Sequence, residues 1–389
     1  MVSFKNFILF FILFSVKFNT FSQSSYITEN LVFDGLNRQY KIYIPSTYDG
    51  SSQYPIIFTF HGGGGTFDDS IAMNDFSTLA ESENFIAVYP QAAVDPLDGS
   101  NAWLHKAPTS HDDIYFIEAI IDALSNQFSI DTNRVYACGY SEGGIFSYEL
   151  ACRLNNKIAA ISSVSGSMLT DSFRDEYYGL GFCTPVHPTA VLMIMGTADF
   201  NYHSTYNGFQ PYYMSVQETA TYWAAYNNCN LEASASDVPN TNTSDGSVVE
   251  RYSWTTAAGC LYVEELKVIG GGHDWPGSFG NMDINSTQEI WNFVSNYDLS
   301  GIISCNGLST SDYNATNPNI VFYPNPTRNE LTVESSFQSP QNFKIFNIRG
   351  QEVLSGVLDV TPTKIDVSDL IQSVYILKIS NNFFRLIIE

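Results

Sequence analysis

The chain has 389 residues, and its 40 acidic residues outnumber its 17 lysines and arginines, so the formal net charge is −23. A nucleic-acid partner is not expected, because the sequence has no cluster of basic residues to neutralise phosphates. Single hydrophobic cores usually stop growing at about 250 to 300 residues, so the length predicts one large domain and one small domain.

The first 22 residues have the pattern of a signal peptide. Lys5 precedes an apolar run from Phe7 to Val16, and Thr20 and Ser22 supply small residues near a cleavage point. A retained anchor is disfavoured, because the run is short for a bilayer and Lys17 follows it directly. We therefore expect an exported protein with no stable membrane span.

The first chemical motif is a glycine run after a predicted strand. Residues 56–60 are apolar, and His61 and four glycines, 62–65, follow them. Acyl transfer needs N–H donors for an oxyanion, and glycines allow the backbone to approach the substrate closely. We expect one donor from Gly63 or Gly64, with His61 bracing the loop. A flexible loop is the alternative, whereas a nucleotide loop is disfavoured because no Gly-Lys-Ser/Thr follows.

The next motif predicts the nucleophile. Residues 135–138 read as a buried strand and residues 145–154 as a helix, and between them lies Gly-Tyr-Ser-Glu-Gly-Gly, residues 139–144. A strand that runs straight into a helix needs a sharp turn, and this turn exposes the hydroxyl of Ser141 above the sheet. The backbone N–H of Glu142 would be the second oxyanion donor. The alternative is a serine that only caps the helix.

Two further predicted strands end in an acid and a histidine. Residues 190–195 run into Asp199, and residues 262–269 run into a glycine-rich loop that contains His273. Ligands of open α/β sheets bind at such strand ends, and the order serine, acid, histidine is that of α/β hydrolases. We expect Asp199 to orient the imidazole and His273 to act as the base. The rival acids are Asp171, Asp175 and Asp274.

Five motifs, in order, resemble the secreted polyhydroxybutyrate depolymerase and feruloyl esterase-like family of α/β hydrolases over residues 26–297. The motifs are Phe60–Gly65, Trp103 with Asp112–Ile117, Gly139–Gly144, Gly196–Asp199 and Gly272–Gly277. The resemblance implies a mostly parallel twisted sheet flanked by helices, and ester hydrolysis through a covalent acyl-enzyme without metal or organic cofactor. Met195 and Phe200 depart from the family pattern, which has histidine and proline at these positions.

The resemblance leaves the substrate open between a polyester and an esterified polysaccharide. Trp103, Tyr140 and Trp275 are expected either to form an aromatic acyl site or to pack in the core and at its rim. A serine peptidase of the same fold and a non-catalytic surface binding protein are the alternative functions.

Export favours disulfide bonds for the six cysteines. Matching positions of the family are paired, which implies a Cys229–Cys260 bridge, and Cys152 and Cys183 similarly bracket the segment between the predicted nucleophile helix and the acid strand. Cys138, under the nucleophile, is expected to be a buried free thiol, and Cys305 has no assigned partner.

A linker, residues 298–319, is expected before a C-terminal domain, residues 320–389. Seven short β-type stretches separated by turn residues predict a small β-sandwich there. The segments 322–327, 346–353 and 374–377 resemble the C-terminal sorting domain of type IX secretion. This implies recognition by that secretion machinery and location outside a Gram-negative cell, on its surface or in the medium. A generic binding module is the alternative.

Overall fold

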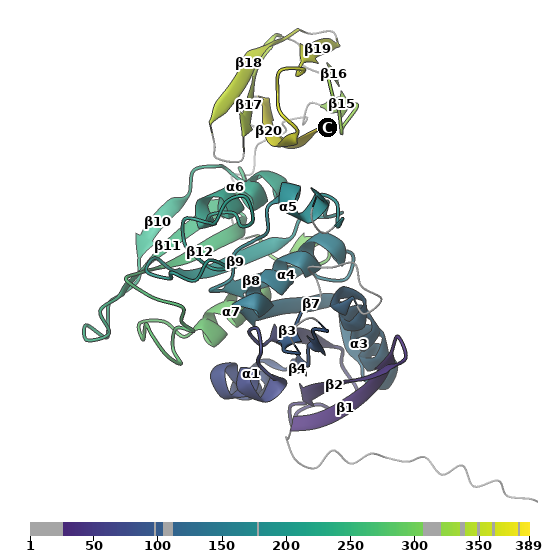
Figure 1. Ribbon diagram of the computed structural model, residues 1–389, viewed down its shortest axis with the longest axis vertical. Coiled ribbons are helices and arrows are strands. Elements are labelled where there is room, and N and C mark those ends of the chain that lie inside the picture. Colours follow the sequence, from purple (N-terminus) through teal and green to yellow (C-terminus); the bar gives the residue numbers. More distant parts are fainter. Residues whose placement is uncertain are drawn as a thin grey trace, which may run out of the picture.

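The computed structural model describes residues 26–96, 99–103, 112–176, 179–305, 320–334, 339–347, 351–359, 362–379 and 382–389 (Figure 1). The expected signal peptide and residues 306–319 of the expected linker lie outside the described residues.

A ten-stranded sheet forms the centre of the N-terminal domain (Figure 1). From edge to edge it contains β1 (Tyr26–Phe33), β2 (Leu36–Tyr43), β4 (Ile86–Pro90), β3 (Tyr54–Phe60), β7 (Ile130–Tyr140), β8 (Ala160–Val164), β9 (Ala190–Gly196), β12 (Leu261–Ile269), β11 (Val248–Thr255) and β10 (Ser234–Asp237). The six strands from β4 to β12 pair in parallel, and the two strands at each edge pair antiparallel. This arrangement confirms the predicted fold class.

Helices cover both faces of the sheet. Their bounds are α1 (Phe67–Asn74), α2 (Ser77–Glu83), α3 (Asp113–Gln127), α4 (Glu142–Arg153), α5 (Asp171–Glu176), α6 (Val216–Tyr226) and α7 (Ser286–Val294). Alternate residues of β3 show the two layers: Ile56 and Phe58 belong to the core with α3, α4 and α6, whereas Ile57 belongs to the core with α2 and α7. Every residue of β3, β4, β8 and β9 is buried, as expected of parallel strands covered on both sides.

Two short hairpins complete this domain, β5 (Ala93–Val94) with β6 (Asn101–Ala102) and β13 (Tyr297–Asp298) with β14 (Gly301–Ile302). The second hairpin falls at the start of the expected linker, residues 298–319, and it is hydrogen-bonded to the rest of the domain. The N–H of Leu299 donates to the Asn133 carbonyl at 3.0 Å. The N–H of Ile302 donates to the Tyr262 hydroxyl at 3.1 Å. The domain therefore continues through residue 305.

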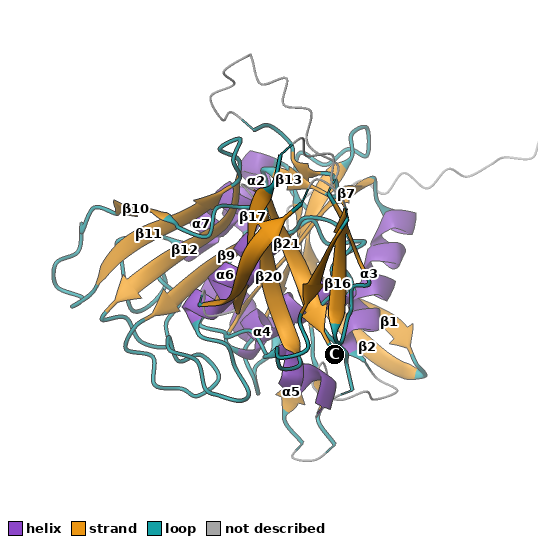
Figure 2. Cartoon of the chain, turned by 90° about the horizontal axis from the view of Figure 1, so that it is seen from above, coloured by secondary structure: helices purple, strands orange, loops and turns teal. Residues whose placement is uncertain are grey.

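The C-terminal domain consists of two antiparallel sheets. One contains β15 (Val321–Tyr323), β16 (Glu330–Glu334) and β19 (Thr363–Asp366), and the other β18 (Glu352–Leu358), β17 (Gln341–Asn347), β20 (Ser373–Ile379) and β21 (Asn382–Ile388). Apolar residues of both sheets, such as Leu331 and Leu377, share one buried cluster. The predicted β-sandwich is therefore confirmed, and Figure 2 shows its strands from above.

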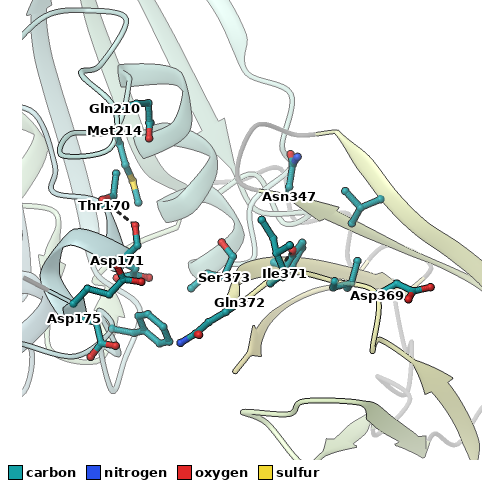
Figure 3. A pocket seen from close by; sticks show the side chains of 17 residues that line it. Thr170, Asp171, Asp175, Gln210, Met214, Asn347, Asp369, Ile371, Gln372 and Ser373 are labelled. Atoms are coloured by element: carbon teal, nitrogen blue, oxygen red, sulfur yellow. Dashed lines mark hydrogen bonds between the residues drawn. The ribbon is translucent and has the colours of Figure 1, made fainter.

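The two domains touch through β20 and β21 on one side and α5 and α6 on the other. Ile376 packs on Ala225, and the guanidinium of Arg385 lies over the Tyr222 ring and 3.8 Å from the carboxylate of Asp171. Beside these contacts lies a cavity of about 730 Å³, which Figure 3 shows with its lining side chains from both domains.

Candidate active site

Ser141 lies in the sharp turn between β7 and α4. Its backbone has φ 54° and ψ −119°, a conformation that non-glycine residues rarely adopt. Neighbouring glycines make the turn possible, because a Cβ on Gly143 would fall 2.4 Å from the carbonyl oxygen of Phe60. A Cβ on Gly139 would fall 2.3 Å from the Gly143 backbone. Close backbone packing therefore presents Ser141 at the end of the sheet, as the sequence predicted.

The structure brings the three predicted triad residues together. The Nε2 atom of His273 lies 2.9 Å from the Oγ of Ser141, and the Nδ1 atom lies 2.7 Å from the Oδ2 of Asp199. The three residues come from the loops after β7, β9 and β12, which end at the same edge of the sheet. This is the geometry in which a histidine accepts a serine proton while a carboxylate fixes its tautomer.

Two groups on the acid loop hold Asp199 in place. Its Oδ1 accepts the N–H of Asn201 at 2.9 Å, and its Oδ2 accepts the hydroxyl of Ser204 at 2.6 Å. Burial alone would raise the pKa of Asp199, but the hydrogen bonds from His273, Ser204 and Asn201 outweigh it and hold the pKa below its ordinary value of 3.8. The carboxylate is therefore ionised when it meets the imidazole.

Ser204 was not foreseen from the sequence. Its Oγ lies 3.0 Å from the Nδ1 of His273 as well as next to Asp199, so it contacts both partners of the acid–base pair. The only signal was a serine five residues after the acid, which is too common a pattern to single out.

The rival acids have other partners. Asp171 forms an ion pair with Arg174, and its Oδ1 accepts the N–H of Cys183. Asp274 accepts the N–H of Gly272 at 2.8 Å. Neither contact involves the imidazole of His273, so the geometry favours Asp199 as the orienting acid.

The backbone geometry favours two of the three expected oxyanion donors. Glu142 is the first residue of α4, where backbone N–H groups have no acceptor within the helix. The N–H of Gly64 donates to the Asn101 carbonyl at 2.7 Å, which removes Gly64 from the predicted pair. Gly63 lies against Glu142, since a Cβ on it would fall 3.1 Å from the Glu142 carboxylate. Gly63 and Glu142 are therefore the candidate donors.

His61 supports the glycine loop and does not act as a second base. Its Nδ1 lies 2.7 Å from the Gly62 carbonyl, and its Nε2 accepts the N–H of Ala92 at 3.1 Å. Burial lowers the pKa of this imidazole, which keeps it neutral. Both ring nitrogens are thus occupied with the loop.

Two of the three predicted substrate-binding aromatics are core residues. Trp103 is 1% exposed, stacks on Phe146 and donates its indole N–H to the His61 carbonyl. Trp275 is 1% exposed and packs in the core with α7. Each ring is enclosed by other side chains, which favours the core-packing alternative for these two residues.

Tyr140 keeps a place beside the site. Its hydroxyl donates to the His273 carbonyl at 2.7 Å, its ring centroid is 5.0 Å from that of His273, and Phe279 lies 6.0 Å away. The residue is partly exposed, so it remains a candidate wall of the substrate site.

The cysteine pairing agrees with the sequence at one bridge and corrects the other. Cys152 is bonded to Cys183 as predicted, and Cys138 is a buried free thiol. Cys260 is bonded to Cys305, whereas Cys229 is buried and unbridged, so the predicted Cys229–Cys260 bridge was wrong. The reason is the hairpin of β13 and β14, which carries the chain back along β12 and delivers Cys305 to Cys260.

Within the described ranges, no three His, Cys, Asp or Glu side chains are grouped to hold a metal ion. None of the helices described in the structure is both long and apolar enough to cross a membrane.

Comparison with known proteins gives relatives among esterases. A bifunctional acetylxylan esterase/xylanase of Neocallimastix patriciarum is 28% identical over 73% of this chain and 37% of its own length. Feruloyl esterase D of Neurospora crassa is 29% identical over 37% of this chain and 50% of its own. The chain thus spans half or less of the length of these two relatives. The acetyl xylan esterase structure from Aspergillus awamori matches with a TM-score of 0.49 and 16% identity, over 69% of this chain and 99% of that one.

Two family models match separate parts of the chain. Residues 321–388 match the secretion system C-terminal sorting domain, in agreement with the expected type IX signal. Residues 57–252, just over half of the chain, match the alpha/beta hydrolase fold. With Ser141 at the turn after β7 and the parallel sheet beneath it, this chain belongs to the alpha/beta hydrolase fold family.

Proposed function

We propose that this protein is an exported serine esterase that hydrolyses carboxylic esters carried by a polysaccharide. The observation that carries the proposal is the hydrogen-bonded chain from Ser141 through His273 to Asp199, with distances of 2.9 and 2.7 Å. A serine that only packed in the core or capped a helix would need no strained backbone. It would also need no hydrogen-bonded histidine and buried carboxylate in this order.

The geometry supports a two-step mechanism. The Nε2 of His273 takes the proton of Ser141 as Oγ attacks the ester carbonyl, and the N–H groups of Gly63 and Glu142 stabilise the oxyanion. The imidazolium is stabilised by ionised Asp199 and returns its proton to the leaving alcohol. Water, activated by the same histidine, then releases the acid from Ser141.

The substrate class rests on the relatives. One relative is named for acetylxylan, an acetylated polysaccharide, and another is named for feruloyl esters. We propose the same class here in preference to polyhydroxybutyrate, the other substrate that the sequence suggested.

Activity should be measured on acetylated xylan, methyl ferulate, polyhydroxybutyrate film and a peptide amide, with Ser141→Ala as the blank. Serine-dependent release from the film or the amide alone would contradict the proposal.

The C-terminal domain is proposed to direct the enzyme through the type IX machinery to the cell surface or the medium. Deleting residues 306–389 in the native host should leave active enzyme in the periplasm, because the hydrolase retains its own core and its Cys260–Cys305 bridge. A comparison truncation that ends at residue 300 lacks Cys305 as well and so loses the Cys260–Cys305 bridge. In the chain-entropy model this bridge contributes about 4 kcal/mol to the free energy of unfolding. Secretion of the longer truncation at the normal level would contradict the sorting role.

A further inference from the structure

A group of exposed aromatic side chains lies on the loop after Asp199. Tyr202, Phe209 and Tyr212, called here the aromatic face, are 52%, 45% and 38% exposed with the C-terminal domain in place. Single exposed aromatic side chains are ordinary, whereas a contiguous group of them on one surface marks a candidate binding site. No residue of the mechanism above uses them.

The rings form one continuous surface. The ring centroid of Tyr202 is 5.8 Å from that of Phe209, and Phe209 lies 5.7 Å from Tyr212 with only 17° between the ring planes. Phe209 and Tyr212 are stacked on each other, so the exposed parts of the two rings form one aromatic surface, called here the platform.

The platform is held rigidly. The N–H of Tyr213 donates to the Phe209 carbonyl and the N–H of Phe209 donates back, both at 3.0 Å. The Tyr212 carbonyl accepts the N–H of Thr170, and the Tyr212 ring packs edge-on against Phe173. A ligand that binds here would therefore lose little affinity to ordering of the loop.

The aromatic face lies on the same loop as a residue that contacts the triad. Between Tyr202 and Ser204 lies His203, whose carbonyl accepts the N–H of Ser167 at 3.0 Å. Ser204 itself contacts both Asp199 and His273. Tyr202 is therefore two residues along the chain from a side chain that touches the acid and the base.

The composition of the loop after Asp199 indicates what kind of ligand the aromatic face would bind. Residues 200–215 contain no aspartate, glutamate, lysine or arginine, although the chain as a whole has a net charge of −23. Their polar groups are hydroxyls, amides and one imidazole, which suit a ligand with many hydroxyl groups and no charge. A pyranose ring has this character, because its C–H face packs on an aromatic ring while its hydroxyls point outward to polar neighbours.

We infer that the aromatic face is a subsite for the uncharged sugar chain that carries the ester, so that the enzyme binds the polymer as well as the acyl group. This inference rests on the proposed function and deepens it. The face selects the polysaccharide, and the triad acts on the acyl group.

Binding is tested in the Ser141→Ala background with ester-free xylan as the probe, by affinity gel electrophoresis of the full chain. The double variant Tyr202→Ala/Phe209→Ala should weaken binding about fivefold or more. Phe209→Leu keeps an apolar side chain without a ring and should also weaken binding, whereas Tyr202→Trp should retain it. The matched control is Tyr115→Ala, which removes a 55% exposed aromatic ring from α3.

Catalysis gives a second readout. With Ser141 present, the double variant should lower the ratio of kcat/KM on acetylated xylan to kcat/KM on p-nitrophenyl acetate by about tenfold, and Tyr115→Ala should leave that ratio unchanged. Thermal unfolding curves check that each variant is folded. If the double variant does not fold, the test is made with Phe209→Leu.

Unchanged xylan binding in the folded variants would overturn the subsite. A second contrary result would be that the protein does not bind xylan but adsorbs to polyhydroxybutyrate film through the same rings. The proposed function fails separately, if hydrolysis of p-nitrophenyl acetate by the wild-type protein does not depend on Ser141.

Discussion

The turn that carries Ser141 and the loop that carries Asp199 follow β7 and β9, on either side of β8, yet they are held by different contacts. The turn is fixed by backbone against backbone, with no room for a Cβ at Gly143. The acid loop has backbone hydrogen bonds too, such as that from the Ser167 N–H to the His203 carbonyl, but the acid itself is held by side-chain hydrogen bonds such as that from Ser204, and the loop exposes aromatic rings. Changes in the turn should therefore abolish function, whereas changes in the acid loop should have graded effects.

The largest effect is expected at the reacting groups. Ser141→Ala and His273→Ala should each lower kcat on p-nitrophenyl acetate by about 10⁴-fold or more, and the double variant should be little worse, because the groups act as a unit. Steady-state kinetics with titrated active enzyme measure this. A folded Ser141→Ala protein that retained a tenth of the activity would refute the mechanism.

The acid should come next. Asp199→Asn should fold but lose about 10³- to 10⁴-fold in kcat, because an amide favours the wrong imidazole tautomer and does not stabilise its cation. Asp274→Asn is the matched control, since this residue accepts the N–H of Gly272 and does not contact the imidazole. We expect a loss of less than about tenfold there. The opposite ranking would assign the acid to Asp274.

Gly143→Ala tests the tight packing of the turn. The added Cβ would meet the Phe60 carbonyl at 2.4 Å, and we expect a loss of about 3 kcal/mol in the free energy of unfolding. Gly246→Ala is the comparison, because Gly246 has a φ of 78° and a Cβ there meets nothing within 4 Å, whereas Gly143 has no positive φ and its Cβ would meet backbone atoms. It should cost about 1 kcal/mol. A loss at Gly143 no larger than that at Gly246, measured by urea unfolding, would mean that close packing does not limit this turn.

The smallest effect is expected at Ser204. Ser204→Ala removes one hydrogen bond to Asp199, and kcat/KM should fall about fivefold to tenfold, with Thr205→Ala in the same loop near wild type. A loss as large as that of Asp199→Asn would show that the acid loop is as intolerant as the turn.

The effect of Ser204→Ala on the free energy of unfolding should also depend on pH. Asp199 has a pKa below 3.8 in the folded protein, so its ionised form contributes stability above the unfolded pKa, and that contribution disappears as the pH falls through the folded pKa. Loss of the Ser204 bond raises the folded pKa toward 3.8. The stability difference between wild type and Ser204→Ala should therefore be full at neutral pH and shrink as the pH falls below 3.8 through the folded pKa of Asp199, as measured by urea unfolding.

The sequence predicted features that depend on local pattern or chain order. Buried apolar runs identified the central strands, and the order of Ser141, Asp199 and His273 identified residues that the structure joins by hydrogen bonds. Turn residues separated the strands of the C-terminal domain well enough to predict its two sheets.

Features that depend on packing at long range were not predictable. Trp103 and Trp275 have the same composition signal whether they line a site or fill a core, and only their neighbours make them core residues. Cys229 is nearer in sequence to Cys260 than Cys305 is, but the partner is decided by the path of the β13–β14 hairpin. Ser204 reaches Asp199 and His273 only because its loop folds back on itself.

The bridge between Cys260 and Cys305 also determines how mechanical force would travel through the molecule. Tension applied to the C-terminal domain enters the hydrolase at residue 305 and passes through the covalent bond to residue 260, at the start of β12. The intervening segment contains β12, His273 and α7, and it lies outside this load path. Backbone tension that enters at residue 305 would therefore not extend the segment between residues 260 and 305, which contains His273.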